Sequence, residues 1–78
     1  MNKEELNTIL QKIDINEIKL IIISTVGLLD VFGKLILDIT FLDGTKKQIQ
    51  VCSPVPVDVI TIWLDTNKLL DITTLYRY

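Results

Sequence analysis

Histidine and alanine are absent from this 78-residue chain, and cysteine occurs only once, as Cys52. Without histidine the chain lacks the side chain that most often acts as a general base, and neither a Ser–His nor a Cys–His pair can form. A single thiol can form no disulfide within the chain and supplies too few ligands for a zinc site. We therefore predict a chain that is not an enzyme and has no catalytic residue, no metal site and no cofactor.

Glycine and basic residues are also scarce. The three glycines, Gly27, Gly33 and Gly44, stand in unrelated contexts and form no glycine-rich phosphate loop. Seven of the eight basic residues are lysines scattered along the chain, and the net charge is −2, so broad binding to nucleic-acid phosphates gains no support. The aspartates, which are spread singly, leave open an acidic surface that imitates those phosphates, although so small a net charge supports it weakly.

No segment of the sequence predicts secretion or membrane insertion. The N-terminus lacks the basic region and following apolar run of a signal peptide. The longest apolar run, residues 18–37, contains Lys19, Asp30 and Lys34, and an aspartate in mid-membrane costs roughly 2.5–3.5 kcal/mol. We expect a cytoplasmic protein that does not enter the membrane.

Apolar residues, in contrast, are abundant. Hydrophobic side chains make up 49% of the chain, with thirteen isoleucines and twelve leucines. A domain of this size buries only about 60% of the surface of its unfolded chain. One interpretation is a dense core of β-strands. The other, which we favour, is an apolar face that is buried against a second copy of the chain or against a partner.

The clearest structural pattern is a β-hairpin over residues 34–52. Side chains alternate on both sides of an Asp-Gly pair, which is typical of a hairpin turn. A two-residue loop would place Leu37 opposite Gln50, whereas a three-residue loop places Leu37 opposite Ile49. Because a shift of one residue moves every side chain to the other face, we predict the three-residue loop, residues 42–44, with its glycine in the left-handed conformation.

A second strand is predicted over residues 17–26, and it has apolar side chains on both faces. Alternation places Ile18, Leu20 and Ile22 on one face and Ile21 and Ile23 on the other. Such a strand is central in its sheet and covered on two sides. The second cover is either a helix or another subunit.

The remaining elements are two helices and one strand. Residues 2–12 show the apolar spacing of a helix, which Asn2 caps. Residues 57–67 are compatible with a helix or a strand, and the helical spacing of their charged residues favours the helix. Residues 69–76 then form the last strand.

These elements predict one α+β domain over residues 1–78. We expect a small antiparallel β-sheet of about four strands, with the order α-β-β-β-α-β, packed by one or two helices. No internal repeat or low-complexity tract divides the chain.

Two stretches are candidates for binding. Residues 27–33 are apolar where a loop is expected; either both strands run long and the glycines mark a tight bend, or the tip inserts into a partner. The C-terminal Tyr-Arg-Tyr is either a packed or frayed end or a contact, since these residue types are enriched in binding hot spots. The candidate binding residues are Leu28, Leu29, Phe32, Tyr76, Arg77 and Tyr78.

By elimination, we predict a non-catalytic protein–protein interaction module that occupies a partner's surface and forms a homodimer. Small inhibitory or accessory proteins of phages and mobile elements have this general style. The alternative is a small nucleic-acid-binding protein that uses the hairpin tip and the C-terminal tail. The contacts of this alternative are Lys46, Lys47, Tyr76, Arg77 and Tyr78.

Overall fold

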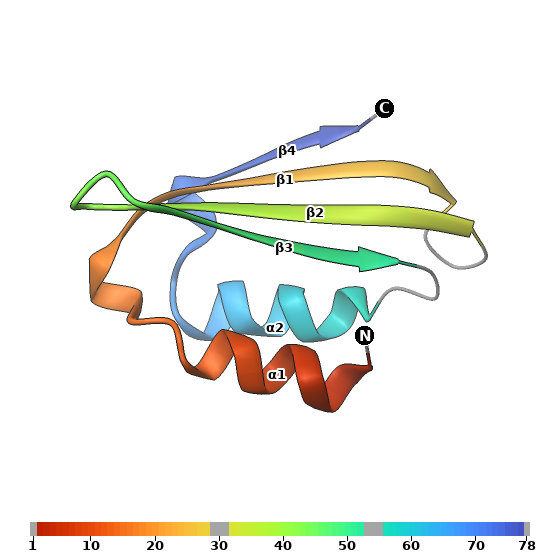
Figure 1. Cartoon of the computed structure of the whole chain (residues 1–78), viewed down its shortest axis with the longest axis horizontal. Helices are drawn as coiled ribbons and strands as arrows, with labels where there is room; N and C mark the ends of the chain where they lie inside the picture. The colour runs from red at the N-terminus through yellow and green to blue at the C-terminus, as the bar shows by residue number, and fades with distance from the viewer. Residues whose placement is uncertain (1, 29–31, 53–55, 78) are drawn as a thin grey trace.

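The computed structural model describes residues 2–28, 32–52 and 56–77 and has two layers, a β-sheet and a pair of helices (Figure 1). Both helices lie against the same face of the sheet, and no helix of the described residues covers the opposite face. The predicted α+β fold and its order α-β-β-β-α-β are confirmed. The elements are α1 (Lys3–Gln11), η1 (Ile15–Glu17), β1 (Ile18–Leu28), β2 (Phe32–Phe41), β3 (Lys46–Cys52), α2 (Val57–Thr66), η2 (Leu70–Ile72) and β4 (Thr73–Arg77), where η denotes a short 3₁₀ helix.

The four strands form a sheet in the order β3-β2-β1-β4. β1 pairs with β2, and β2 with β3, in antiparallel fashion, whereas β4 lies parallel to β1. The sheet is therefore mixed, whereas the sequence predicted an antiparallel sheet. α2 connects β3 to β4. The helix carries the chain back along the sheet, so that β4 starts at the same end of the sheet as β3. β4 consequently runs in the same direction as β3 and β1.

The hairpin of β2 and β3 has the predicted three-residue loop. Leu37 pairs with Ile49, which is the register that loop parity requires. The backbone N–H of Gly44 donates to the carbonyl oxygen of Phe41 at 3.0 Å. Gly44 has a φ of 89°, a left-handed conformation that glycine adopts without strain.

A β-bulge changes which side chains of β1 enter the core. The register of β1 against β2 shifts by one residue between Ile18 and Leu20. The extra residue turns Ile18 toward the helices, where it is buried together with Ile21 and Ile23. Alternation predicts that Ile18 lies on the same face as Leu20. This prediction is wrong, because the pattern of apolar residues does not reveal where a bulge inserts an extra residue.

The N-terminal helix forms where its apolar spacing predicts it. The side-chain oxygen of the N-cap Asn2 accepts a hydrogen bond of 2.8 Å from the backbone N–H of Glu5. This bond satisfies one of the backbone donors that the first turn leaves without a helical partner. Leu6 and Leu10 project from α1 into the core and are fully buried.

The helical interpretation of the segment after β3 is also confirmed, and the C-cap of α2 is Asn67. The last strand, however, begins at Thr73 and not at Leu69. Lys68 has a φ of 57°, and η2 follows it. These residues carry the chain from the end of α2 back to the sheet, so fewer residues remain for β4 than alternation predicts.

The core fills the space between the sheet and the helices. Among the described residues it contains no polar or charged side chain. The side chains of the core with no exposed surface come from α1, β1, β2 and β3, and they are Leu6, Leu10, Ile21, Leu37, Ile39 and Val51. Ile60, Trp63 and Leu64 of α2 close the core from the other layer. One apolar face of each element is thus buried against the other layer.

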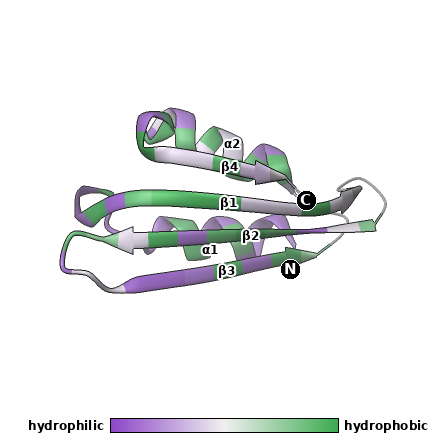
Figure 2. Cartoon of the chain, turned by 90° about the horizontal axis from the view of Figure 1, so that it is seen from above, coloured by the Kyte–Doolittle hydropathy of each residue, from purple (hydrophilic) through white to green (hydrophobic). Residues whose placement is uncertain are grey.

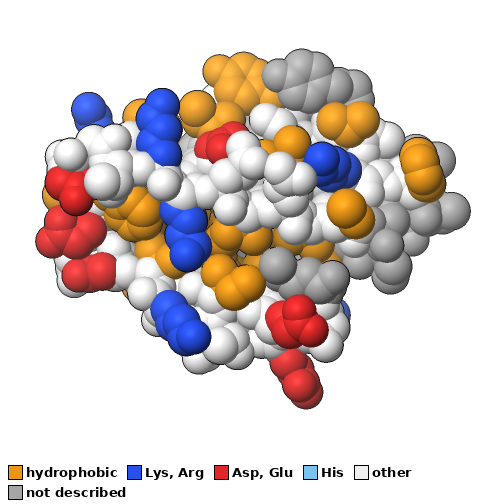
Figure 3. Space-filling view, viewed as in Figure 1, with side chains coloured by type: hydrophobic (Ala, Val, Ile, Leu, Met, Phe, Trp, Pro, Cys, Tyr) orange, Lys and Arg blue, Asp and Glu red, His pale blue; other side chains and the backbone are white. Residues whose placement is uncertain are grey.

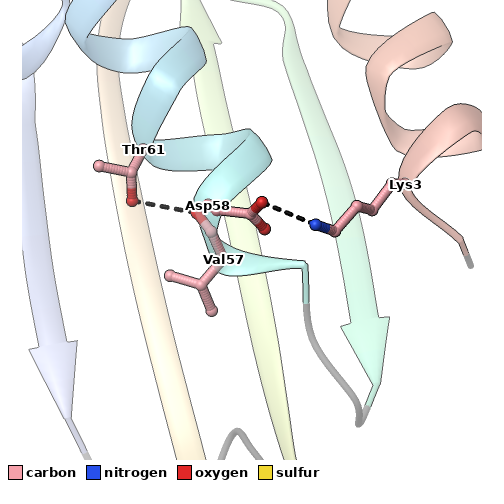
Figure 4. A network of polar contacts seen from close by, with 4 residues as sticks. All are labelled: Lys3, Val57, Asp58 and Thr61. Atoms are coloured by element: carbon pink, nitrogen blue, oxygen red, sulfur yellow. Dashed lines mark hydrogen bonds and ion pairs between the residues drawn. The ribbon is translucent and has the colours of Figure 1, made fainter.

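One ion pair joins the two helices at their first turns. Nζ of Lys3 donates to Oδ2 of Asp58 at 2.7 Å (Figure 4). The hydrogen bond from Lys3 and its positive charge lower the pKa of Asp58 below the ordinary value of 3.8. In the same turn of α2 the hydroxyl of Thr61 donates to the carbonyl oxygen of Val57 at 3.0 Å.

A comparison with Asp58→Asn across pH tests this ion pair. Because the pKa of Asp58 is lower in the folded chain, the pair stabilises the fold above the ordinary aspartate pKa of 3.8, and this contribution disappears as the pH falls through the folded value. We expect the wild type to melt slightly above the variant at pH 6 and low salt, and the two melting temperatures to converge toward pH 3. Asp43, whose pKa is lowered by the hydroxyl and backbone N–H of Thr45, is present in both proteins and cancels. A difference that grows on acidification would contradict the prediction.

Candidate interaction surfaces

The even-numbered residues of the four strands, from Leu20 onward, form the side of the sheet that faces away from the helices, which we call the open face (Figure 2). Side chains of successive strand residues point to opposite faces, so the odd-numbered residues of these strands supply the core. The apolar residues of the open face are Leu20, Ile22, Val26, Phe32, Ile36 and Tyr76. They follow β1 and the strands beside it, so an apolar stripe lies along the central strand.

The β3 side of the open face is polar. Nε2 of Gln48 donates to Oδ1 of Asp38 at 3.0 Å, and Nε2 of Gln50 donates to Oε1 of Gln48 at 2.6 Å. These bonds hold the polar side chains of β2 and β3 to one another. The open face is therefore divided along the strands into an apolar half and a polar half. Figure 2 shows that β1 as a whole is more hydrophobic than β3.

A second apolar surface lies between α2 and β4, in a groove of about 350 Å³ that we call the α2–β4 groove. Its aliphatic lining includes Ile23, Leu35, Val57, Ile60, Leu70 and Leu75. Leu70 is 53% exposed and Leu75 54% exposed, although both are apolar side chains beside the core. No segment of the described chain fills this groove.

The polar groups of the α2–β4 groove already have partners. The hydroxyl groups of Thr25, Thr61 and Thr73 donate to backbone carbonyl oxygens at 3.4, 3.0 and 2.7 Å respectively. The groove therefore offers an occupant few free donors and a large aliphatic wall, which favours an aliphatic group. Asp65, Lys68 and Asp71 line a smaller hollow beside Leu70 at one end, so the charged groups of that hollow are two acids and one base.

The predicted binding residues with a described backbone lie on three strands of the sheet, where Leu28 pairs with Phe32 and Tyr76 precedes Arg77 in β4. Phe32 is 82% exposed at the start of β2, and Tyr76 is 49% exposed on the open face beside β1. The two strands do run long, since Gly27 pairs with Gly33. For Leu28 and Arg77 only the backbone is described, in β1 and β4. Leu29 and Tyr78 lie outside the described residues.

The residues of the nucleic-acid alternative do not share one surface. Lys46 and Lys47 are the first residues of β3, one on each side of the sheet, and the turn itself lies before them. Arg77 ends β4, at the opposite edge of the sheet. The basic side chains visible in Figure 3 are likewise dispersed over the face shown.

Sequence reasoning did not single out Ile36, Leu70 or Leu75 as surface residues. Ile36 stands on the second face of the hairpin strand, so its position was visible as an apolar residue among polar ones. Leu70 and Leu75 were not recognised as exposed, because leucine is among the residues that are most often buried in a core.

The described residues contain no group of three or more carboxylate or thiol side chains arranged to hold a metal ion. Cys52 is a free, exposed thiol at the end of β3. Within residues 2–28, 32–52 and 56–77 no helix is both long and apolar enough to cross a membrane.

The open face and the α2–β4 groove are thus two surfaces with apolar side chains that are not buried in the core. Comparison with known proteins adds no relative to this geometry: no family model, no curated protein and no solved structure matches the chain.

Proposed function

We propose that this chain is a non-catalytic protein–protein interaction module that forms a homodimer and acts by occupying the surface of a second protein. Small inhibitory or accessory proteins of phages and mobile elements are the class with which this activity is most compatible. The observation that carries the proposal is the α2–β4 groove, where leucine side chains beside the core stay more than half exposed. Covering them removes apolar surface from water, which stabilises a complex by about 25 cal/mol per Å².

The position of the groove suggests how a partner binds. β4 is an edge strand of the sheet, and an extended segment can add to such an edge through backbone hydrogen bonds. Every second side chain of the added segment then points toward the helical side, into the groove. We expect a partner segment with aliphatic residues at alternate positions and a lysine or arginine near Asp65 and Asp71.

Charge substitutions at the exposed leucines test the groove. Leu70→Glu and Leu75→Glu should each reduce capture of the partner from a bacterial lysate by tenfold or more (about 1.4 kcal/mol per tenfold), because a carboxylate must be desolvated against an aliphatic wall. Ile62→Glu is the matched control, since Ile62 is an exposed residue of α2 that does not line the groove. A protein retained by all three variants would not be a ligand of the groove.

The same preparations distinguish the nucleic-acid alternative. A salt-dependent mobility shift with nucleic acid, lost in Lys46→Glu and Lys47→Glu, would favour that alternative over protein binding. We expect no such shift, because these two lysines lie on opposite sides of β3.

A further inference from the structure

The open face leaves the apolar stripe of the central strand β1 in contact with water, although Ile18, Ile21 and Ile23 on the other side of the same strand are buried in the core. We propose that a second copy of this chain covers the open face, with the two sheets packed face to face about a two-fold axis that passes through Ile36. This arrangement rests on the self-association in the proposed function, and it is independent of the α2–β4 groove, which lies on the other side of the sheet.

The charges of β2 identify the second copy as the occupant. Lys34 and Asp38 are half-buried side chains of the open face, and each stands two residues from Ile36. A two-fold axis that runs across the strands at Ile36 lays β2 over the β2 of the second copy in the opposite direction. Lys34 then faces the second copy's Asp38, and Asp38 faces its Lys34. One surface thus supplies both halves of two complementary ion pairs.

Two other two-fold arrangements of the same face are disfavoured by charge. An axis that runs along β2 would place Lys34 over Lys34 and Asp38 over Asp38, and like charges in an interface cost several kcal/mol. An axis between β1 and β2 would place Lys34 over Val26 and Asp38 over Ile22, since these residues are paired across the two strands. That arrangement would bury both charges without partners.

The remaining rows of the open face are compatible with the axis at Ile36. Ser24, Gln50 and Tyr76 lie in the same row as Ile36, so each meets its own counterpart. On β1, Ile22 comes to lie over the second copy's Val26. The apolar half of each sheet therefore covers the apolar half of the other. At the rim, Gln50 meets its own counterpart and Gln48 lies over the second copy's Cys52.

The area of the face suits a stable dimer. The four strands of the sheet have 11, 10, 7 and 5 residues. At about 3.3 Å per residue and about 4.8 Å between strands, they give a flat footprint of about 500 Å². A standard interface buries about 800 Å² of accessible surface on each partner, and accessible surface exceeds a flat footprint because it follows the side chains. Two sheets packed in this way lie about 10 Å apart, a distance that isoleucine, lysine and aspartate side chains span together.

Charge reversal tests the arrangement by sedimentation equilibrium. We expect the wild type to be a dimer, and Lys34→Asp and Asp38→Lys each to raise the dimer dissociation constant by at least about tenfold. Each variant opposes like charges at both pairs. An equimolar mixture of the two variants should recover dimerisation, because one copy then carries two acids and the other two bases at these positions. The double variant Lys34→Asp/Asp38→Lys should recover it as well.

Lys47→Asp is the matched control, since Lys47 is an exposed lysine of β3 on the helical side of the sheet, and it should dimerise as the wild type does. Circular dichroism of each variant establishes that it is folded, and recovery in the mixture cannot arise from two misfolded chains. A monomeric wild type, or single variants that dimerise normally, or a mixture that stays monomeric would each overturn the proposed dimer. None of these results would affect capture of a partner by the groove, which Leu70→Glu tests separately.

Discussion

Replacing Leu37 by alanine is expected to lower the free energy of unfolding by about 2–5 kcal/mol, because the substitution removes buried methyl groups and leaves a cavity. Leu37 has no exposed surface and lies in the middle of β2, between Ile23 of β1 and Ile49 of β3. Ile23 and Ile49 are themselves buried, so the cavity cannot collapse easily. Since small domains are stable by only about 5–15 kcal/mol, this variant should be close to unfolding at physiological temperature.

Urea denaturation followed by circular dichroism measures the effect, at one fixed protein concentration because the proposed dimerisation would stabilise the folded state. Leu42→Ala is the matched control, because it makes the same chemical change at a hairpin residue that is 62% exposed. We expect it to lower the free energy of unfolding by at most about 0.5 kcal/mol. Equal losses in the two variants would mean that Leu37 is not at the centre of the core.

Replacing Gly27 by alanine is expected to have the next largest effect, and a larger one than the same change at Gly44. Both glycines have left-handed backbones, with φ of 79° and 89°, which cost an L-residue about 1–2 kcal/mol. A Cβ at Gly27 would in addition lie 2.7 Å from the carbonyl oxygen of Phe32, whereas at Gly44 it would meet nothing within 4 Å. Backbone cannot rotate away as a side chain can, so the paired ends of β1 and β2 must separate.

Hydrogen exchange locates this effect, and denaturation gives its size. In Gly27→Ala we expect faster amide exchange at the ends of β1 and β2 and a loss of stability above the cost at Gly44. In Gly44→Ala the loss of stability should stay within about 1–2 kcal/mol. Amide exchange should be unchanged at the end of the β2–β3 hairpin that is remote from Gly44. The reverse order of the two losses would show that the close approach of Gly27 to β2 does not exist in solution.

The register of the β2–β3 hairpin is the part of the fold that sequence predicts best. Parity alone requires Leu37 to face Ile49, because both are apolar and separated by a short loop that ends in glycine. The first helix follows from its apolar spacing and from Asn2 at its start, and the second from the helical spacing of its charged residues. These signals are local: each depends on residues a few positions apart.

The candidate surfaces were only partly predictable. The apolar residues on both sides of the strand over residues 17–26 indicated a second cover, and this side is now the open face. Alternation places Leu20 and Ile22 correctly on this side and Ile18 wrongly, because the bulge between Ile18 and Leu20 shifts the alternation. The α2–β4 groove was not predictable, since it brings together residues from five elements.

By itself, the sequence determined the types of element, their order and the hairpin register, because these depend on side-chain periodicity and turn chemistry over short stretches. Only the tertiary structure decided that β4 lies parallel to β1, that both helices lie on one side, and that Lys46 and Arg77 stand at opposite edges. Those features depend on which distant segments pack together, which is the summed result of many weak contacts and not of any local pattern.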